Sequence, residues 1–229
     1  MTNGQPHISS YIDHTILKPV CLFAEIDRLC SEAVQYEFAA VCVPPYTVKR
    51  AAGKTIGKKV KTATVIGFPM GYSSMQSKLA EIKLAMEEGA DELDVVINLI
   101  ALKNGQWDYL EKEMQELVKA IHQKEKVIKV IVESGLLTTE EIIHCCGLYG
   151  GMGIDYMKTS TGYADPGASV ADVQLMRREL PERVQIKASG GIRTYAFAKE
   201  LIAAGATRIG CSGSLALVAQ EKEDLMLAK

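Results

Sequence analysis

Two lysines stand near the ends of short apolar runs. Lys158 follows Ile154-Asp155-Tyr156-Met157, and Lys187 follows Val184-Gln185-Ile186. A single lysine at a strand end usually extends its ammonium group into solvent, and lysine is almost never buried without cause. Two such lysines on neighbouring strands are different: at about 6 Å and an effective dielectric constant of about 20, their ammonium groups repel by about 3 kcal/mol. We therefore expect one of the two amines to be neutral near neutral pH.

A neutral amine is a nucleophile for carbonyl carbons. The iminium that forms is an electron sink, and it allows an adjacent carbon–carbon bond to break or form without a metal ion. The proton transfers of such a reaction need an acid or base, and Asp94, at the end of Asp91-Glu92-Leu93-Asp94, is the candidate. The alternative for Asp94 is a solvated carboxylate at a strand end. Together these residues indicate covalent aldolase chemistry.

Two glycine-rich segments late in the chain are typical of phosphate binding. Ser189-Gly190-Gly191-Ile192-Arg193-Thr194 and Gly210-Cys211-Ser212-Gly213-Ser214 each lead directly into a helical pattern. Backbone amides of such turns and of helix N-termini attract a phosphate dianion. One Gly-Gly turn is more often only a tight connection, but two in consecutive loops favour a phosphorylated small molecule as the substrate.

The elements that must position these residues alternate along the chain. Short β-branched runs at 39–43, 60–66, 92–97, 127–132, 154–157, 184–186 and 207–209 predict seven strands, and the weaker run 11–17 supplies an eighth. Amphipathic helices are predicted between them. Eight strand-plus-helix units of about 29 residues predict an α/β fold, a (β/α)8 TIM barrel forming one domain over 1–229. An open, doubly wound sheet is disfavoured because no G-x-G-x-x-G turn follows Val43.

In such barrels the active site lies at the carboxyl ends of the strands. The polar residues that end the predicted strands are therefore candidates for the site. They are Asp13, His14, Thr15, Cys42, Asp94, Asn98, Glu133, Ser134, Lys158, Thr159, Ser160, Thr161, Lys187, Ser189 and Ser212.

Composition narrows the class of partner. The chain has 26 basic and 28 acidic residues, a net charge of −2, which gives no electrostatic reason to expect nucleic acid or a membrane surface. Residues 1–10 are polar, unlike a signal peptide, and no apolar run reaches 18 residues, so we expect a cytoplasmic protein. The six cysteines are expected to be reduced, and the four histidines lack metal-ligand spacing. A small-molecule substrate, no metal and a possible homodimer are predicted.

Several motifs give the chain a specific family resemblance. They are Asp13-His14-Thr15-x-Leu17, Val41-Cys42-Val43-x-Pro45, Val65-Ile66-Gly67-Phe68-Pro69, Asp91-Glu92-Leu93-Asp94, Met157-Lys158-Thr159-Ser160-Thr161-Gly162, Lys187-Ala188-Ser189-Gly190-Gly191-Ile192-Arg193-Thr194 and Arg208-Ile209-Gly210. With these, nearly the whole chain resembles the deoxyribose-phosphate aldolases, Schiff-base aldolases built on a TIM barrel.

The resemblance implies a reaction and a set of roles. The reaction is reversible cleavage of 2-deoxy-D-ribose 5-phosphate to acetaldehyde and D-glyceraldehyde 3-phosphate, with no metal or organic cofactor. Lys158 would form the Schiff base, Asp94 would donate and accept protons, and Lys187 would tune Lys158 and relay protons. The positions implied near the phosphate are Gly162, Gly190, Gly191, Arg193 and Ser212, and the other substrate-binding positions are Asp13, Thr15, Cys42, Thr161 and Gly210.

Two other functions fit the same barrel. A sugar-phosphate isomerase would work through an enediol with a carboxylate base, and Glu133 at the end of the fifth strand would be that base. A catalytically silent phosphosugar-binding barrel would use Lys158 only as an ion-pairing residue, because a fold alone does not specify catalysis.

Overall fold

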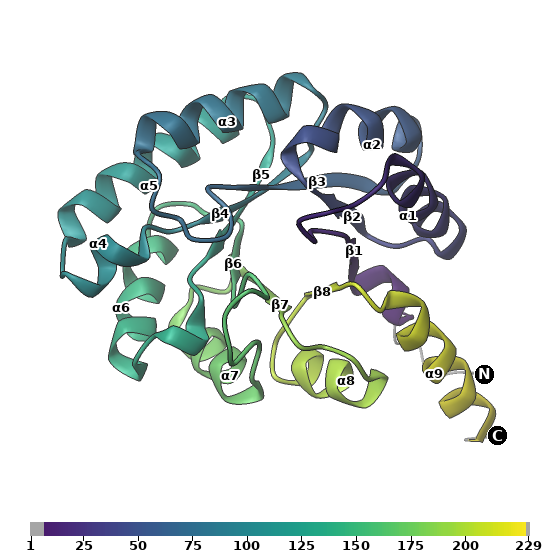
Figure 1. Cartoon of the computed structure of the whole chain (residues 1–229). Helices are drawn as coiled ribbons and strands as arrows, with labels where there is room; N and C mark the ends of the chain where they lie inside the picture. The colour runs from purple at the N-terminus through teal and green to yellow at the C-terminus, as the bar shows by residue number, and fades with distance from the viewer. Residues whose placement is uncertain (1–6, 228–229) are drawn as a thin grey trace.

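Eight short runs of apolar residues form the strands of one closed sheet. The computed structural model describes residues 7–227, so residues 1–6 and 228–229 of the predicted domain 1–229 lie outside the described part. The strands pair in parallel in the order β1 to β8, and β8 returns to β1 (Figure 1). Their bounds are β1 (Ile12–Thr15), β2 (Ala40–Val43), β3 (Lys61–Ile66), β4 (Glu92–Val96), β5 (Val127–Ile131), β6 (Tyr156–Lys158), β7 (Gln185–Ser189) and β8 (Arg208–Cys211). The predicted TIM barrel is confirmed.

Helices surround the sheet as an outer layer (Figure 1). Their bounds are α1 (Phe23–Tyr36), α2 (Val48–Thr55), α3 (Met75–Glu87), α4 (Leu99–Lys103), α5 (Trp107–His122), α6 (Thr139–Gly150), α7 (Val170–Glu179), α8 (Tyr195–Ala203) and α9 (Ser214–Leu227), with short 3-10 turns η1 (Ile8–Tyr11), η2 (Pro45–Thr47) and η3 (Ser134–Leu136). Side-chain caps begin several helices: the hydroxyl of Thr138 accepts from the amide of Glu141, and that of Thr194 accepts from the amide of Phe197.

Side chains along each strand alternate between the helical layer outside the sheet and the interior of the barrel. One face of the strands packs against the helices in a large apolar cluster that includes Val41, Val43 and Leu93. The other face points into the barrel, where β2 and β3 contribute only a small apolar cluster of Ala40, Cys42, Ala63 and Val65. The remaining strands contribute buried charged side chains to the same space, as described below.

The boundaries of β6, β7 and β1 differ from the predicted ones. β6 begins at Tyr156 rather than at residue 154, because the Asp155 side chain takes the hydrogen bond from the Ile128 amide (2.9 Å) that a strand neighbour would otherwise receive. β7 extends to Ser189, so Lys187 lies in the middle of its strand instead of following it. β1 is only four residues long, shorter than the predicted run 11–17.

The cysteines are free thiols, and Cys21 alone among them is not fully buried. Cys145 and Cys146 lie side by side in α6, where burial raises the pKa of each thiol to about 12. Neither thiol is poised for redox chemistry at neutral pH.

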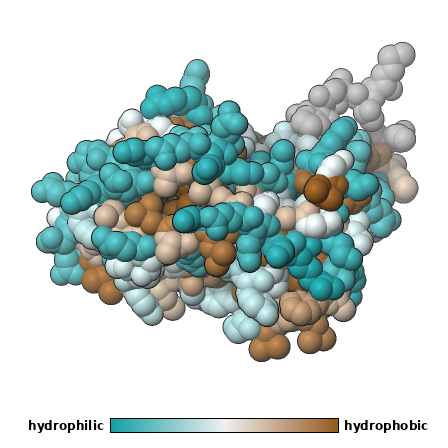
Figure 2. All heavy atoms as spheres, turned by 90° about the horizontal axis from the view of Figure 1, so that it is seen from above, coloured by the Kyte–Doolittle hydropathy of each residue, from teal (hydrophilic) through white to brown (hydrophobic). Residues whose placement is uncertain are grey.

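Polar and charged side chains cover most of the face seen in Figure 2, and apolar residues are scattered among them. Within residues 7–227, none of the helices has the length and apolar character needed to cross a membrane.

Candidate active site

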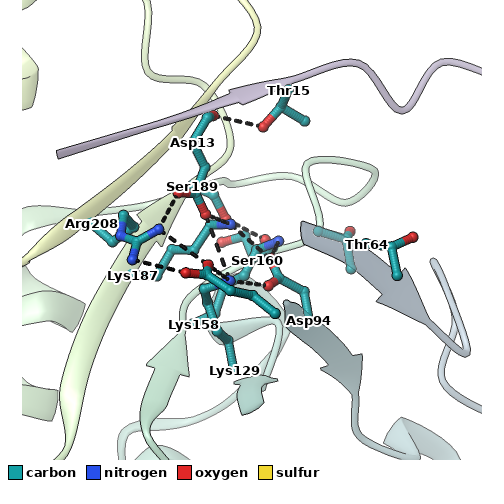
Figure 3. A network of polar contacts seen from close by, with 12 residues as sticks. Asp13, Thr15, Thr64, Asp94, Lys129, Lys158, Ser160, Lys187, Ser189 and Arg208 are labelled. Atoms are coloured by element: carbon teal, nitrogen blue, oxygen red, sulfur yellow. Dashed lines mark hydrogen bonds and ion pairs between the residues drawn. The ribbon is translucent and has the colours of Figure 1, made fainter. Parts of the chain in front are cut away.

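Three side chains that are far apart in the sequence meet inside the barrel. Asp94 points inward from β4, Lys187 from β7, and Lys158 from the last position of β6, directly beside Lys187 in the strand register. One carboxylate oxygen, Oδ2 of Asp94, accepts hydrogen bonds from Lys158 Nζ (2.8 Å) and from Lys187 Nζ (2.7 Å). Figure 3 shows these side chains converging from their separate strands. The structure thus brings together the three residues that the sequence suggested for catalysis.

A third lysine, which the sequence reasoning did not single out, completes the contacts of Asp94. Lys129 in β5 donates to the other oxygen, Oδ1 (2.7 Å), and pairs with Glu92 of β4 (2.6 Å). The signal was present, because Lys129 interrupts the apolar run Val127-Ile128-Lys129-Val130-Ile131. The sequence did not reveal the counterions of Lys129, because they lie about 35 residues away along the chain.

Arg208 of β8 closes this set of ion pairs. Its guanidinium donates to Asp13 Oδ1 (2.6 Å) and to Glu92 Oε2 (3.1 Å), and the other oxygen of Asp13 accepts from Lys187. We call these seven residues the ionic cluster: Asp13, Glu92, Asp94, Lys129, Lys158, Lys187 and Arg208.

The ionic cluster contains four basic groups and three carboxylates. Uncompensated charge is costly inside a protein, so the arrangement favours the loss of one proton from a base. Lys129 lies within 4 Å of three carboxylates, and Lys187 pairs with two, whereas Lys158 pairs with Asp94 alone. Lys158 is therefore the base that gives up its proton most readily.

The pKa shifts agree with this charge balance. Burial lowers the pKa of Lys158; the Asp94 carboxylate opposes that shift and the charge of Lys187 adds to it. Burial acts in the same direction on Lys187 and Lys129, but the carboxylates around them prevail and raise both pKa values. The expected repulsion between the two amines is thus present, but burial is the larger cause. Lys187 and Lys129 stay protonated while Lys158 is the amine that can become neutral.

Two carboxylates of the ionic cluster, those of Asp94 and Asp13, are held as anions. Burial alone would raise the pKa of Asp94, but Lys129, Lys158 and Lys187 outweigh it and hold that pKa well below the usual range. Asp13 behaves in the same way beside Lys187 and Arg208. In the resting site Asp94 is therefore a proton acceptor, and the protonated Lys187 on the same oxygen is the group that can donate.

A cavity of about 450 Å³ opens above the ionic cluster at the carboxyl ends of the strands. Of the charged residues in the ionic cluster, Lys158 alone lines it, although Lys158 is only 3% exposed. The other sequence-predicted residues that line the cavity are Thr15, Thr161, Gly162, Ser189, Gly190, Gly191, Arg193, Gly210 and Ser212. Cys211, within the second predicted phosphate segment, also lines it, as do Lys18 and Tyr163, for which the sequence predicted no role.

Four of the residues to which the family resemblance assigns a role do not line this cavity, and neither do the strand-end candidates His14, Asn98, Glu133, Ser134, Thr159 and Ser160. Asp13, Asp94 and Lys187 lie in the ionic cluster, and Cys42 lies in the small apolar cluster of β2 and β3. Cys42 is fully buried, and burial raises the pKa of its thiol.

Glycine is required at one strand position beside the lysines. A Cβ atom on Gly210 would lie 2.8 Å from the side chain of Ser189 and 3.1 Å from Cε of Lys187. The bare backbone of β8 therefore leaves room for Lys187 to reach Asp94. At the carboxyl end of β7, Gly190 and Gly191 both have positive φ and precede α8, whose N-cap is Thr194.

Glu133, the candidate base of an isomerase, is turned away from the cavity. It is 2% exposed, and its carboxylate accepts from the amide and the hydroxyl of Thr161. A general base must reach the proton it removes, so this position does not favour enediol chemistry. In residues 7–227 there is also no group of three histidine, cysteine or carboxylate side chains arranged to hold a metal ion.

Comparison with known proteins gives the family. A family model described as DeoC/LacD family aldolase matches residues 8–220. A deoxyribose-phosphate aldolase of Thermococcus gammatolerans is 49% identical over 213 residues, covering 92% of this chain and 95% of that protein. A second, from Caldicellulosiruptor saccharolyticus, is 46% identical and covers 93% of this chain and 98% of its own length.

The fold agrees with these relatives. The structure of a tetrameric deoxyribose-phosphate aldolase from Aeropyrum pernix superposes with a TM-score of 0.88 at 31% identity, covering 94% of this chain and 91% of that one. The family resemblance of the sequence motifs is thereby confirmed. With its family model spanning nearly all of the barrel, the chain belongs to the DeoC/LacD family of aldolases.

Proposed function

We propose that the protein catalyses the reversible aldol cleavage of 2-deoxy-D-ribose 5-phosphate to acetaldehyde and D-glyceraldehyde 3-phosphate through a Schiff base on Lys158. The observation that carries this proposal is that Lys158, a buried amine with a lowered pKa, lines the cavity and shares Asp94 with the protonated Lys187. The curated relatives described above carry the name of this activity.

The first step forms the covalent intermediate. The neutral Nζ of Lys158 attacks the aldehyde carbon C1 of the open-chain sugar phosphate and forms a carbinolamine. Asp94 Oδ2, 2.8 Å from Nζ, accepts the proton that the nitrogen releases and passes it to the alkoxide oxygen of the carbinolamine. Lys187, bonded to the same oxygen, supplies a proton to the departing hydroxyl, so that water leaves and the iminium remains.

The second step breaks the carbon–carbon bond. The C3 hydroxyl gives its proton to Lys187, which lost its own proton in the first step and later returns this one to C2. The C2–C3 bond breaks, and the electron pair of that bond moves toward the iminium nitrogen. D-glyceraldehyde 3-phosphate departs and leaves an enamine on Lys158. Protonation of the enamine at C2 then gives the acetaldehyde iminium, which water hydrolyses to acetaldehyde and free Lys158.

The phosphate of the substrate is assigned to the glycine-rich end of the cavity. Gly190 and Gly191 lie in the turn before α8 and Ser212 lies in the turn before α9, and all three residues line the cavity, so we assign the phosphate to these two turns. Arg193 lines the same cavity and supplies a positive charge. Gly162, on the loop after β6, lies against the Gly190 turn.

The remaining predicted contacts belong to the sugar. Thr15 and Thr161 line the cavity wall, and Gly210 lines it as well. Asp13 acts from below by holding Lys187 and Arg208. Cys42 belongs to the apolar side of the barrel, next to Thr15 in the strand register.

Trapping with borohydride tests the covalent step. Acetaldehyde and borohydride together should leave an ethyl group on Nζ of Lys158, which peptide mass spectrometry locates. The exposed Lys83 is the internal control, because it reports any nonspecific alkylation of surface amines. An isomerase or a silent binding barrel would show equal modification at the two lysines, and that result would refute the Schiff-base mechanism.

A further inference from the structure

Glu133 holds an unusual backbone conformation next to the active site. At the end of β5 its φ is 55° and its ψ is 57°, the left-handed region that costs energy for any residue with a Cβ. Glu37 and Glu125 are the other two non-glycine residues with positive φ among residues 7–227, and both are exposed in turns that follow helices. Glu133 differs because it is 2% exposed.

The buried carboxylate of Glu133 is bound by one residue of the neighbouring loop. The amide of Thr161 donates to its two oxygens at 3.1 and 3.3 Å, and the Thr161 hydroxyl donates to Oε2. That hydroxyl oxygen in turn accepts from the amide of Tyr163 (3.0 Å). Hydrogen bonds to an ionised acceptor are among the stronger ones in proteins, so Glu133 fixes the loop of residues 161–163.

This loop forms one wall of the cavity. Thr161, Gly162 and Tyr163 all line it, and the hydroxyl of Tyr163 donates to the carbonyl oxygen of Leu17 on the opposite rim (2.7 Å). Gly162 lies directly against Gly190, since a Cβ on Gly162 would be 3.9 Å from the Gly190 Cα atom. The position of the loop therefore sets how closely the Gly162 backbone approaches the Gly190–Gly191 turn.

We propose that Glu133 is a positioning residue for the phosphate end of the substrate. It does not line the cavity, and it acts through Thr161 by holding the Gly162 backbone beside the Gly190–Gly191 turn. This proposal rests on the proposed function, because it assumes that this end of the cavity receives a phosphate. The energetic cost of burying a carboxylate on a left-handed backbone is then explained by the precision it gives to that wall.

Kinetics with a phosphorylated and an unphosphorylated sugar distinguish this positioning role from a merely structural one. For Glu133→Ala we expect KM for 2-deoxyribose 5-phosphate to rise about tenfold or more, the effect of losing hydrogen bonds to a charged acceptor, while kcat falls only a few-fold. The kcat/KM for unphosphorylated 2-deoxyribose should change by less than about twofold. An equal loss for both sugars would overturn the proposal.

Two further variants isolate the carboxylate. Glu133→Gln keeps the size of the side chain and one acceptor oxygen, so it should fold and give a smaller rise in KM. Glu133→Gly relieves the positive φ but removes the carboxylate, so it should behave like Glu133→Ala. Wild-type KM in Glu133→Gly would show that only the backbone shape matters and would contradict the proposal.

Glu113→Gln is the matched control. Glu113 is also a buried carboxylate, 1% exposed, but it pairs with Lys78 in the helical layer, 2.9 Å away. Its loss should lower Tm without changing the preference for the phosphorylated sugar. The same shift in preference in Glu113→Gln would mean that general destabilisation, rather than Glu133, produces it.

Inorganic phosphate provides a readout that does not need turnover. Calorimetry should give a Kd for phosphate that is about tenfold weaker in Glu133→Ala than in the wild type. If the wild type binds phosphate but does not cleave 2-deoxyribose 5-phosphate, the proposed function fails while this measurement still tests Glu133. Equal or undetectable phosphate binding in both proteins would overturn the role assigned to Glu133.

Discussion

Buried basic side chains lie both in the deep part of the barrel interior and at its rim, but their pKa values are shifted in opposite directions. In the deep part, Lys129 and Arg208 each pair with at least two carboxylates, and both stay charged. At the rim, Lys158 pairs with one carboxylate, lines the cavity, and has a lowered pKa. The comparison teaches that burial alone does not make a lysine nucleophilic. The number of anions around each amine decides which one can lose its proton.

Replacing Lys158, the lysine at the rim, should have the largest effect on activity. In Lys158→Arg the positive charge beside Asp94 remains, but a guanidinium does not lose its proton at any pH at which proteins fold. We expect kcat/KM to fall by about 10⁴-fold or more, as for the loss of a covalent nucleophile. Steady-state kinetics measures this loss.

The control for this change is Lys83→Arg on the surface of α3, which should retain full activity. Substantial residual turnover in Lys158→Arg would show that another group carries the reaction.

Removing the neighbouring charge should give an intermediate effect. Lys187→Leu abolishes a positive charge that lowers the pKa of Lys158, so that pKa should rise. At a given pH a smaller fraction of Lys158 is then neutral, and the acid limb of the profile of kcat/KM against pH moves to higher pH. With a proton donor also lost, activity near neutral pH should fall by about 100-fold.

The pH profile is the sharper half of this test. If Lys187→Leu lowers activity without moving the acid limb, Lys187 acts only as a proton donor and does not tune Lys158. Circular dichroism checks that the barrel is retained.

Replacing Lys129 in the deep part of the barrel should lower the free energy of unfolding more than it lowers the rate of catalysis. Lys129→Met removes one buried counterion from each of Asp94 and Glu92, which costs about 3–5 kcal/mol of unfolding free energy. Lys126→Met is the matched control, since Lys126 pairs with Asp91 while partly exposed, and its loss should cost less than about 1 kcal/mol. Urea unfolding compares the two, and equal costs would mean that the deep pairs are not required for the fold.

Local patterns carried most of the fold prediction. Apolar runs separated by amphipathic helices predicted all eight strands, because strand propensity and alternation are written into neighbouring residues. The boundaries at β6 and β7 were wrong by a few residues because Asp155 and the ladder of β7 are set by contacts with other strands. Lys158, Lys187 and Asp94 were found because lysines and a carboxylate stand out in apolar runs.

Other features of the site were beyond local patterns. Lys129 lies in a predicted strand with no partner nearby in the sequence, the sequence predicted no role for Tyr163, and it predicted Glu133 only as the base of an isomerase. Each owes its place to a residue on a different strand or loop.

The sequence by itself determined a barrel of parallel strands, the family, and which residue types reach the carboxyl ends of those strands. Only the tertiary structure decided which charges meet, because closing the barrel brings Asp13 and Arg208 together from positions 195 residues apart. It also decided which lysine becomes reactive. A pKa depends on burial and on the distance to every nearby charge, and no stretch of neighbouring residues contains those quantities.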